Sequence, residues 1–565
     1  MWKQPWGYRE GWTICAGIFF TGIFLQWLFG EIVPELFRFP VHLIAGALFL
    51  LCLLLLHFLS VKIKLMQWFG GNRAAITALV SLLSMIIFMG FTNARVMVSW
   101  PFVLLSFYFL SILGFVILRR LGCFRWKDSG FILNHAGLFI AFFAGLLGSS
   151  DIQRLRISVP VDETEWRATN EKNEMVELPL AIELKSFTID EYPPKLMLLD
   201  NVTGAALPAK KPQNVSIESF PLFTRLLDWE LEVVNWLPGA AVIANADTVN
   251  CVAYHWEGAT SALYVKAINM MDGTQKEGWV SCGNYRFQYV ALRLNEQVSL
   301  IMPNIEPRCF TSDVTVYTQS GITKDALIEV NKPLSVDGWK IYQLSYDIAM
   351  GKWSRYSVFE LVKDPWLPVV YLGIIMMLAG ALFLFISAIR WRHKWIISII
   401  SFVFIGVYLL HPVINNKTLM PALQSPWFLP HVIVYMLAYS LLGIAAINAL
   451  YLLIKPNTTE KQIAIIATCD NIVYVGTAFL TMGMLIGAIW AKTAWGHYWS
   501  WDPKETWAAA TWISYLLYIH FRLHHPAERK TALYIVLAAF VVLQICWLGV
   551  NYLPSAQGNS IHVYN

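Results

Sequence analysis

Apolar runs long enough to cross a membrane constrain this chain more than any other feature. A helix that spans the hydrocarbon core needs about 20 predominantly apolar residues. Eleven runs of roughly that kind occur, near residues 12–30, 41–61, 75–92, 98–118, 131–149, 366–389, 395–411, 431–454, 469–489, 503–522 and 531–550. Only 14% of the residues are charged, whereas a soluble domain has about a quarter. The sequence therefore predicts a polytopic α-helical membrane protein with about eleven transmembrane helices.

The basic residues orient these helices, because cytoplasmic loops are enriched in Lys and Arg. With the N-terminus in the cytoplasm, the cytoplasmic loops carry 17 basic residues and the short outer loops carry 5. The 17 are Lys3, Arg9, Lys62, Lys64, Arg73, Arg119, Arg120, Arg125, Lys127, Arg390, Arg392, Lys394, Lys455, Lys461, Arg522, Arg529 and Lys530, and the 5 are Arg38, Arg95, Lys417, Lys492 and Lys504. An odd number of helices then places the C-terminus outside. The small, dispersed net charge of +5 argues against a nucleic-acid partner.

A polar region between residues 150 and 365 separates two groups of apolar runs. Its segments "DVTVYTQSG" and "WKIYQLSYD" are rich in β-forming residues, and "VDGW" and "MDGT" contain Asp-Gly pairs typical of turns. We expect one β-rich extracytoplasmic domain here. The predicted organisation is a first transmembrane half (1–150), this domain (151–365) and a second transmembrane half (366–565).

One connection between two apolar runs, "WAKTAWGHYWSWDPKETW", is exceptionally rich in tryptophan. We call residues 490–507 the tryptophan segment; its five tryptophans are Trp490, Trp495, Trp499, Trp501 and Trp507. Asp502, Pro503 and Glu505 have the spacing of a helix start with a capping box. One or two tryptophans are typical of a membrane interface, but five favour a platform for a large, flat, apolar ligand. Haem is such a ligand, and its propionates would meet Lys492 or Lys504.

The same segment resembles a known signature. "WAKTAWGHYWSWDPKETWA" is similar to the tryptophan-rich WWD signature of the haem-handling superfamily that includes CcsA (ResC), CcmC and CcmF. "IEVNKPLSVDGWKIYQLSYD" is similar to the closing stretch of the extracytoplasmic domain of CcsB (ResB). Together they resemble a fused CcsBA, the System II cytochrome c synthase family.

This resemblance implies a function. Members export haem across the cytoplasmic (inner) membrane and act as holocytochrome c synthases, or haem lyases, which join haem vinyl groups to the CxxCH thiols of an apocytochrome c. The implied substrate is haem b in its Fe(II) form, and the implied partners are apocytochrome c, thiol-reducing proteins of the same pathway and the lipid bilayer. Two alternatives stay open, namely a haem exporter or chaperone without ligation activity and a membrane b-type electron carrier.

Histidines are the candidate axial ligands for the haem iron. The family places external histidines at positions that match His431 and His562, which are therefore the candidate catalytic residues. It also has a histidine pair near the cytoplasmic edge, for which His57 and His520 are the candidates. Each lies 17 residues after a proline at the outer start of its run, about 26 Å down a helix. His135 lies near the same edge and is the alternative to His57.

The cysteines give no motif. None of the eight forms a CxxC pair, so a zinc ribbon or a thioredoxin-like site is not predicted. Cys251, Cys282 and Cys309 share the polar region, where a disulfide is possible but not indicated. The chain also lacks a CxxCH sequence of its own, so we do not expect it to be its own substrate.

Overall fold

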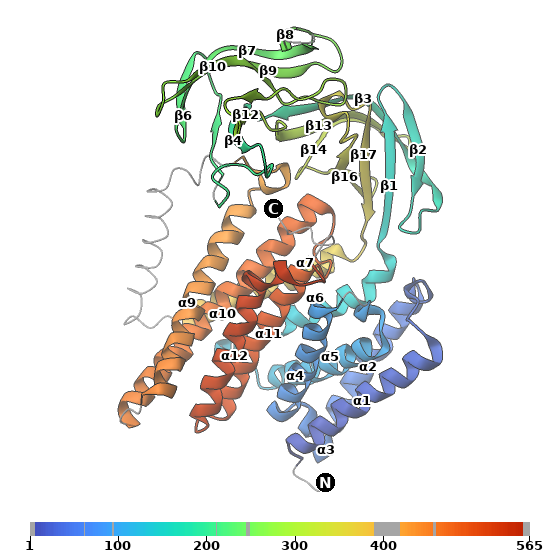
Figure 1. The fold of residues 1–565 in the computed structure, drawn as a ribbon. Helices are drawn as coiled ribbons and strands as arrows, with labels where there is room; N and C mark the ends of the chain where they lie inside the picture. Colours follow the sequence, from blue (N-terminus) through green and yellow to red (C-terminus); the bar gives the residue numbers. More distant parts are fainter. Residues whose placement is uncertain are drawn as a thin grey trace. The chain divides into compact units, whose positions relative to one another are not determined.

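The computed structural model describes residues 6–60, 63–92, 95–210, 212–244, 249–388, 418–455 and 459–556. These form two compact units (Figure 1). The first comprises Met1–Gln153, Lys363–Asn415 and Ser425–Asn565, and the second comprises Arg154–Val362 and Asn416–Gln424. The sequence thus leaves the first unit after the fifth predicted span and re-enters it just before the sixth.

The first unit is helical. Its helices are α1 (Tyr8–Phe29), α2 (Val41–Ser60), α3 (Lys64–Phe69), α4 (Asn72–Phe91), α5 (Trp100–Leu121), α6 (Ser129–Gly148), α7 (Leu367–Ala388), α9 (Phe428–Ile454), α10 (Thr459–Trp495), α11 (Pro503–His524) and α12 (Arg529–Trp547). Short 3₁₀ turns lie between several of them, including η3 (Trp126–Asp128), η4 (Ser149–Asp151) and η9 (Gly549–Tyr552).

The prediction of a polytopic helical membrane protein is confirmed. Within the described ranges, nine helices are long and apolar enough to cross a membrane. The predicted run 503–522 is the helix α11, which is not among the nine; it carries Lys504, Glu505 and Arg522 beside several aromatic and polar residues. The predicted run 395–411 lies outside the described residues.

Close helix packing joins the two halves of the chain. α6 of the first half packs along α7 of the second half, and within the second half α9 packs along α10 (Figure 1). At the first interface, a Cβ atom on Gly137 would lie 2.8 Å from the carbonyl oxygen of Gly373. Only a residue without a side chain fits such a close backbone approach. α11 is covered by α4, α10 and α12, so its less apolar side chains face other helices.

The second unit is built from antiparallel β-structure, which confirms the predicted β-rich domain. Its strands are β1 (Gln153–Pro160), β2 (Thr164–Thr169), β3 (Met175–Glu191), β4 (Lys195–Asp200), β5 (Asn214–Ser216), β6 (Leu222–Leu226), β7 (Trp229–Ala244), β8 (Val249–Ala253), β9 (Thr260–Asn269), β10 (Gln275–Ser281), β11 (Leu292–Arg293), β12 (Val298–Ile301), β13 (Pro307–Thr318), β14 (Thr323–Glu329), β15 (Leu334–Val336), β16 (Trp339–Tyr346) and β17 (Tyr356–Lys363).

In the described residues of this unit, the strands form three sheets. The largest has eight strands in the order β14-β13-β3-β2-β1-β17-β16-β15, the second runs β10-β9-β7-β6 with β8 beside β7, and the third runs β11-β12-β4-β5. "WKIYQLSY" is β16, and the Asp-Gly of "VDGW" forms the two-residue turn that pairs Val336 with Trp339. Asp337 and Gly338 both have positive φ angles, 48° and 79°, as a type I′ hairpin requires.

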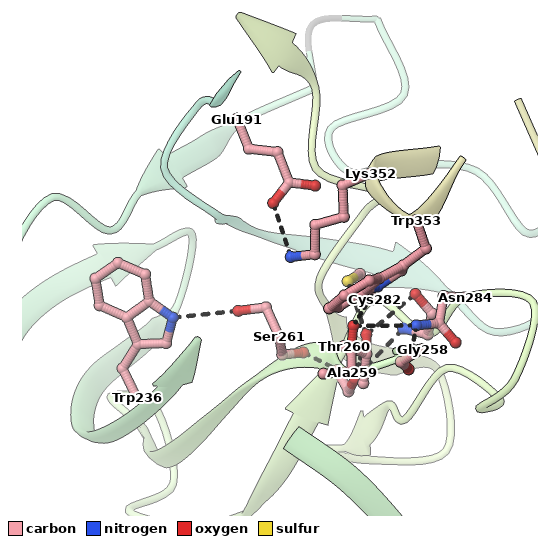
Figure 2. A network of polar contacts seen from close by, with 12 residues as sticks. Glu191, Trp236, Gly258, Ala259, Thr260, Ser261, Cys282, Asn284, Lys352 and Trp353 are labelled. Carbon is pink, nitrogen blue, oxygen red and sulfur yellow. Dashed lines mark hydrogen bonds and ion pairs between the residues drawn. The ribbon is translucent and has the colours of Figure 1, made fainter. Parts of the chain in front are cut away.

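A polar network links the segment before β17 to the second sheet (Figure 2). Trp353 donates its indole N–H to the carbonyl oxygen of Ala259 at 3.2 Å, and Lys352 pairs with Glu191 at 3.0 Å. Thr260, next in the chain to Ala259, has its hydroxyl oxygen 3.4 Å from the sulfur of Cys282. These contacts give the loop that precedes β9 a fixed position.

The cysteines of this unit are free thiols, as are all eight in the chain. Cys251 is buried in β8, and burial raises the pKa of its thiol to about 11. Such a thiol stays protonated at neutral pH and is a poor nucleophile. We therefore assign Cys251 a packing role.

Candidate functional site

The tryptophan segment joins the end of α10 to the start of α11. α10 ends at Trp495, and Gly496 turns the chain with a φ angle of 75°. At the start of α11, Asp502 accepts a hydrogen bond from the backbone N–H of Lys504, and Glu505 accepts one from the N–H of Asp502. The capping role predicted for this Asp-Pro-Lys-Glu sequence is confirmed. Trp501 has a φ angle of 58°, which costs a non-glycine residue roughly 1–2 kcal/mol.

His431 lies on α9 and packs into a notch of α10. Its Nδ1 is 2.9 Å from the carbonyl oxygen of Gly483, so the proton sits on Nδ1 and Nε2 carries the lone pair that can bind a metal. A Cβ on Gly487 would lie 2.6 Å from the ring of His431, and a Cβ on Gly483 would lie 2.9 Å from the ring of Tyr435. Because the two glycines, one helical turn apart, have no side chains, the rings of His431 and Tyr435 fit against α10.

The tryptophans fall into three groups. Trp490 lies 5.6 Å from His431 and 5.1 Å from Trp495 between ring centroids. Trp499 and Trp501 meet edge to face at 5.7 Å, and Trp501 meets Phe102 of α5 in the same way. The structure brings the first group to His431 and the second to the first half of the chain.

Trp507 forms the third group. It is only 1% exposed and donates its indole N–H to the carbonyl oxygen of Gly90 at 3.2 Å. Its ring meets Phe91 edge to face at 4.9 Å. These contacts make Trp507 a packing residue between α11 and α4, whereas the sequence suggested a part in the platform.

The two lysines of the segment differ in their surroundings. Lys492 is buried, and its ammonium nitrogen lies 3.0 Å from Oδ2 of Asp364 and 3.0 Å from the carbonyl oxygen of Gly496. Lys504 is half-buried, and its ammonium lies 3.4 Å from the side-chain oxygen of Asn551. Lys492 is thus already paired with an acid, whereas Lys504 contacts a neutral amide.

A histidine pair lies towards the other end of α11. The rings of His520 and His135 of α6 have centroids 6.3 Å apart and planes inclined at 68°. Nδ1 of His520 is 2.7 Å from the carbonyl oxygen of Leu516, and Nδ1 of His135 is 2.8 Å from that of Phe131. Both residues therefore carry the proton on Nδ1 and the lone pair on Nε2, which is the ligand form of imidazole.

His57, the first choice from the sequence, is placed differently. It lies on α2, which packs against α3, α5 and α6, and its ring neighbours that of Phe58 at 6.0 Å. The ring beside His520 belongs to His135, so the geometry favours the alternative. His562, the second external histidine, lies outside the described residues.

Arg120 was not singled out by the sequence analysis. Its guanidinium lies 5.4 Å above the ring of Phe131, which stacks on His135 at 3.9 Å. Arg120 also pairs with Asp128 at 2.6 Å. Only the ring of Phe131 thus lies between this cation and the histidine pair. The signal in the sequence is the four-residue spacing of Phe131 and His135, which puts them on one helix face.

Comparisons with known proteins agree with the resemblance. Residues 363–556 match the family described as Cytochrome C assembly protein, and residues 279–354 match the ResB-like family. The proteins named cytochrome c biogenesis protein CcsA from Chlamydomonas reinhardtii and Guillardia theta are 41% and 40% identical over 154 and 173 residues. Each alignment covers 26% of this chain, and 42% and 56% of the relative.

A third relative gives the same result. The CcsA protein from Prochlorococcus marinus (strain MIT 9515) is 36% identical over 181 residues, which cover 26% of this chain and 56% of the relative. The chain thus spans about half the length of these curated relatives. The Cytochrome C assembly match contains the whole tryptophan segment. One chain therefore carries a cytochrome c assembly protein region and a ResB-like region, which is consistent with a fused CcsBA-type protein of cytochrome c biogenesis.

Proposed function

We propose that the protein is a cytochrome c synthase that carries haem across the membrane and attaches it to an apocytochrome c. In the attachment, each cysteine thiol of a CxxCH sequence adds across a haem vinyl group. The S–H bond and the vinyl π bond break, while one C–S and one C–H bond form, so the step has no net oxidation or reduction. The substrate is haem b with Fe(II), and the partner is an apocytochrome c whose thiols are kept reduced by separate proteins.

The observation that carries this proposal is the His135–His520 pair. With metal–imidazole bonds of about 2 Å, two rings on opposite sides of one iron have centroids about 6 Å apart. The observed separation is 6.3 Å. Both rings also have the proton on the nitrogen that faces their own helix. We propose these two histidines as the axial ligands of an inner haem, in place of His57.

The outer site is proposed around His431. His431 is held by α10 in the ligand form, and Trp490 and Trp495 supply apolar surface next to it. Burial of apolar area contributes about 25 cal/mol per Å², so indole rings support haem binding without a covalent bond. His562 is proposed as the second ligand and Lys504 as the propionate contact. The histidine of CxxCH then replaces one external ligand.

The inner site can be tested in the purified protein. We expect a haem Soret band from the wild type. We expect His135→Gly and His520→Gly to lower haem content, and added imidazole to restore it in part, because imidazole fills the space and supplies the lost ligand. His57→Gly serves as the matched control and should keep wild-type haem.

Two results would contradict the assignment. A wild-type protein without any haem band would remove the proposed function. A loss of haem that follows His57→Gly and spares His135→Gly would return the inner ligand to α2. Ligation itself is measured as cytochrome c yield in cells, since a haem exporter, a haem chaperone or a b-type electron carrier would also show a Soret band.

A further inference from the structure

A buried ion pair ties the tryptophan segment to the chain between β17 and α7. The ammonium nitrogen of Lys492 and Oδ2 of Asp364 are 3.0 Å apart, and their side chains are 2% and 4% exposed. Asp364 directly follows the last residue of β17, Lys363, and lies three residues before the start of α7. In sequence the two partners are 128 residues apart.

The pair is poorly suited to a purely stabilising role. Removing two charges from water costs several kcal/mol per ion, and two apolar side chains often replace such a pair without loss of stability. Oδ1 of Asp364 is also buried without a hydrogen-bond partner in the described residues, which adds a further cost. The effect of the pair is instead to fix the direction in which the Lys492 side chain points.

Lys492 uses this geometry to hold a turn. Its ammonium group also donates to the carbonyl oxygen of Gly496 at 3.0 Å. That carbonyl lies one residue beyond the end of α10, where the φ angle of 75° starts the turn. A lysine at a helix C-terminus binds such carbonyls favourably. The turn sets the direction in which the chain runs from Trp495 to Tyr498, and the ring of Tyr498 lies 5.9 Å from the Lys492 ammonium.

The position of Asp364 is fixed in turn by its neighbours. Trp366, two residues further on, donates its indole N–H to Oδ2 of Asp151 at 2.9 Å. The same oxygen lies 3.1 Å from Nε2 of the buried His42. A Cβ on Gly148 would lie 2.5 Å from the ring of Trp366, so α6 also confines this ring. Trp366, two residues after Asp364, is therefore confined by Asp151 and by α6, and Asp151 in turn lies beside His42 of α2.

We propose that Asp364 is a positioning residue for haem at the tryptophan segment, acting through Lys492 on the turn at Gly496. This inference rests on the proposed function, because it assigns the haem contact to the segment that the turn orients. Asp364 itself touches no substrate. Its carboxylate keeps the Lys492 ammonium on the Gly496 carbonyl, and this contact keeps Trp495 beside Trp490, the neighbour of His431.

The test uses the full-length protein and the neutral, isosteric change Asp364→Asn. We expect external haem per protein to fall about fivefold to tenfold, because the buried lysine loses the carboxylate that neutralises it and must move or lose its proton. We also expect the Soret band to shift, because His431 and Trp495 no longer meet the haem as before. The matched control is Glu191→Gln, which removes another Lys–acid pair of the same 3.0 Å separation on β3 and should change neither quantity.

A second readout does not depend on haem. In the wild type, Lys492 should resist an amine-acylating reagent, whereas the half-exposed Lys185 should react; mass spectrometry of the digested protein reports both. In Asp364→Asn, Lys492 should become reactive. A wild type without haem would remove the proposed function, and the acylation pattern would still show whether Asp364 holds Lys492.

The double change Asp364→Leu with Lys492→Met separates positioning from folding. Two apolar side chains should restore the amount of folded protein in the membrane even if Asp364→Asn does not fold. We expect the double variant to keep the altered Soret band, because methionine cannot donate to the Gly496 carbonyl. The inference would be wrong if either Asp364→Asn or the double variant had the haem content and the spectrum of the wild type. That result would not contradict the proposed function.

Discussion

At the residue scale, neighbouring tryptophans with the same sequence signal have different environments. Trp507 is enclosed between α11 and α4 with its N–H bonded to Gly90, whereas Trp495 is half-buried beside Trp490 and close to His497. The sequence "WDPKETW" does not predict this difference in burial between Trp507 and Trp495, because the difference depends on the contact of α4 with α11. Only the cap at Asp502 was predictable locally, since the cap hydrogen bonds join Asp502 to Lys504 and Glu505, which lie within three residues.

This difference predicts two kinds of loss. Trp507→Ala should destabilise the helical unit by about 3–5 kcal/mol, because it removes a large buried side chain, and should lower the amount of folded protein. Trp495→Ala should leave the amount of protein near the wild-type level and lower haem content. Quantitative blotting of membranes measures the amount of protein, and the haem content is measured per purified protein. Equal losses of haem per protein in both variants would contradict the distinction between a packing role for Trp507 and a haem-binding role for Trp495.

At the element scale, the sequence predicted elements better than their partners. The apolar runs located the described spanning helices and "VDGW" located a hairpin, because both signals are local. The histidine pair depends on a contact between α6, which carries His135, and α11, which carries His520. These two helices come from different halves of the chain. The 17-residue spacing from a proline made His57 a valid partner for His520, but the sequence also places His135 near the same membrane edge. Only the packing of the helices distinguishes the two candidates. The Lys492–Asp364 pair had no local signal at all.

One helix contact did carry a signal in the sequence. Gly483 and Gly487 are four residues apart on α10, the spacing at which small residues let a second helix approach. They receive the rings of Tyr435 and His431 from α9. The glycines thus set the depth at which the His431 ring lies against α10.

This contact predicts a sensitive position. In Gly487→Ala, the new methyl group would lie 2.6 Å from the His431 ring, so the ring must shift and its hydrogen bond to Gly483 must weaken. We expect lower cytochrome c yield and a changed haem spectrum with the amount of protein largely retained. Gly443→Ala on α9 is the matched control, because its Cβ would meet Phe540 at an ordinary 3.6 Å. An unchanged spectrum in Gly487→Ala would show that His431 does not bind the haem iron.

At the scale of the whole molecule, the proposed transport of haem requires the two proposed haem sites to lie near different faces of the membrane. The tryptophan segment runs into the start of α11. His520 lies 17 residues after Pro503, which corresponds to about 26 Å of helix. One site therefore lies near each end of α11. Which site faces the cytoplasm depends on the orientation of the helical unit, and the basic residues favour the end that carries His520, Arg522 and Arg529.

The orientation predicts the outcome of reporter fusions. A reporter enzyme that is active only outside the cytoplasm should be active when fused after Asn565 and inactive when fused at Arg125, in the loop before α6. The physical reason is the excess of Lys and Arg in the loops assigned to the cytoplasm, because cationic loops are retained there. A reporter inserted in the turn between β13 and β14, for example after Gly321, should be active and serves as a check on the β unit. The inverted pattern would put the tryptophan segment in the cytoplasm. Haem would then meet His431 first and the His135–His520 pair last, and the proposed attachment to an external apocytochrome at the tryptophan segment would be impossible.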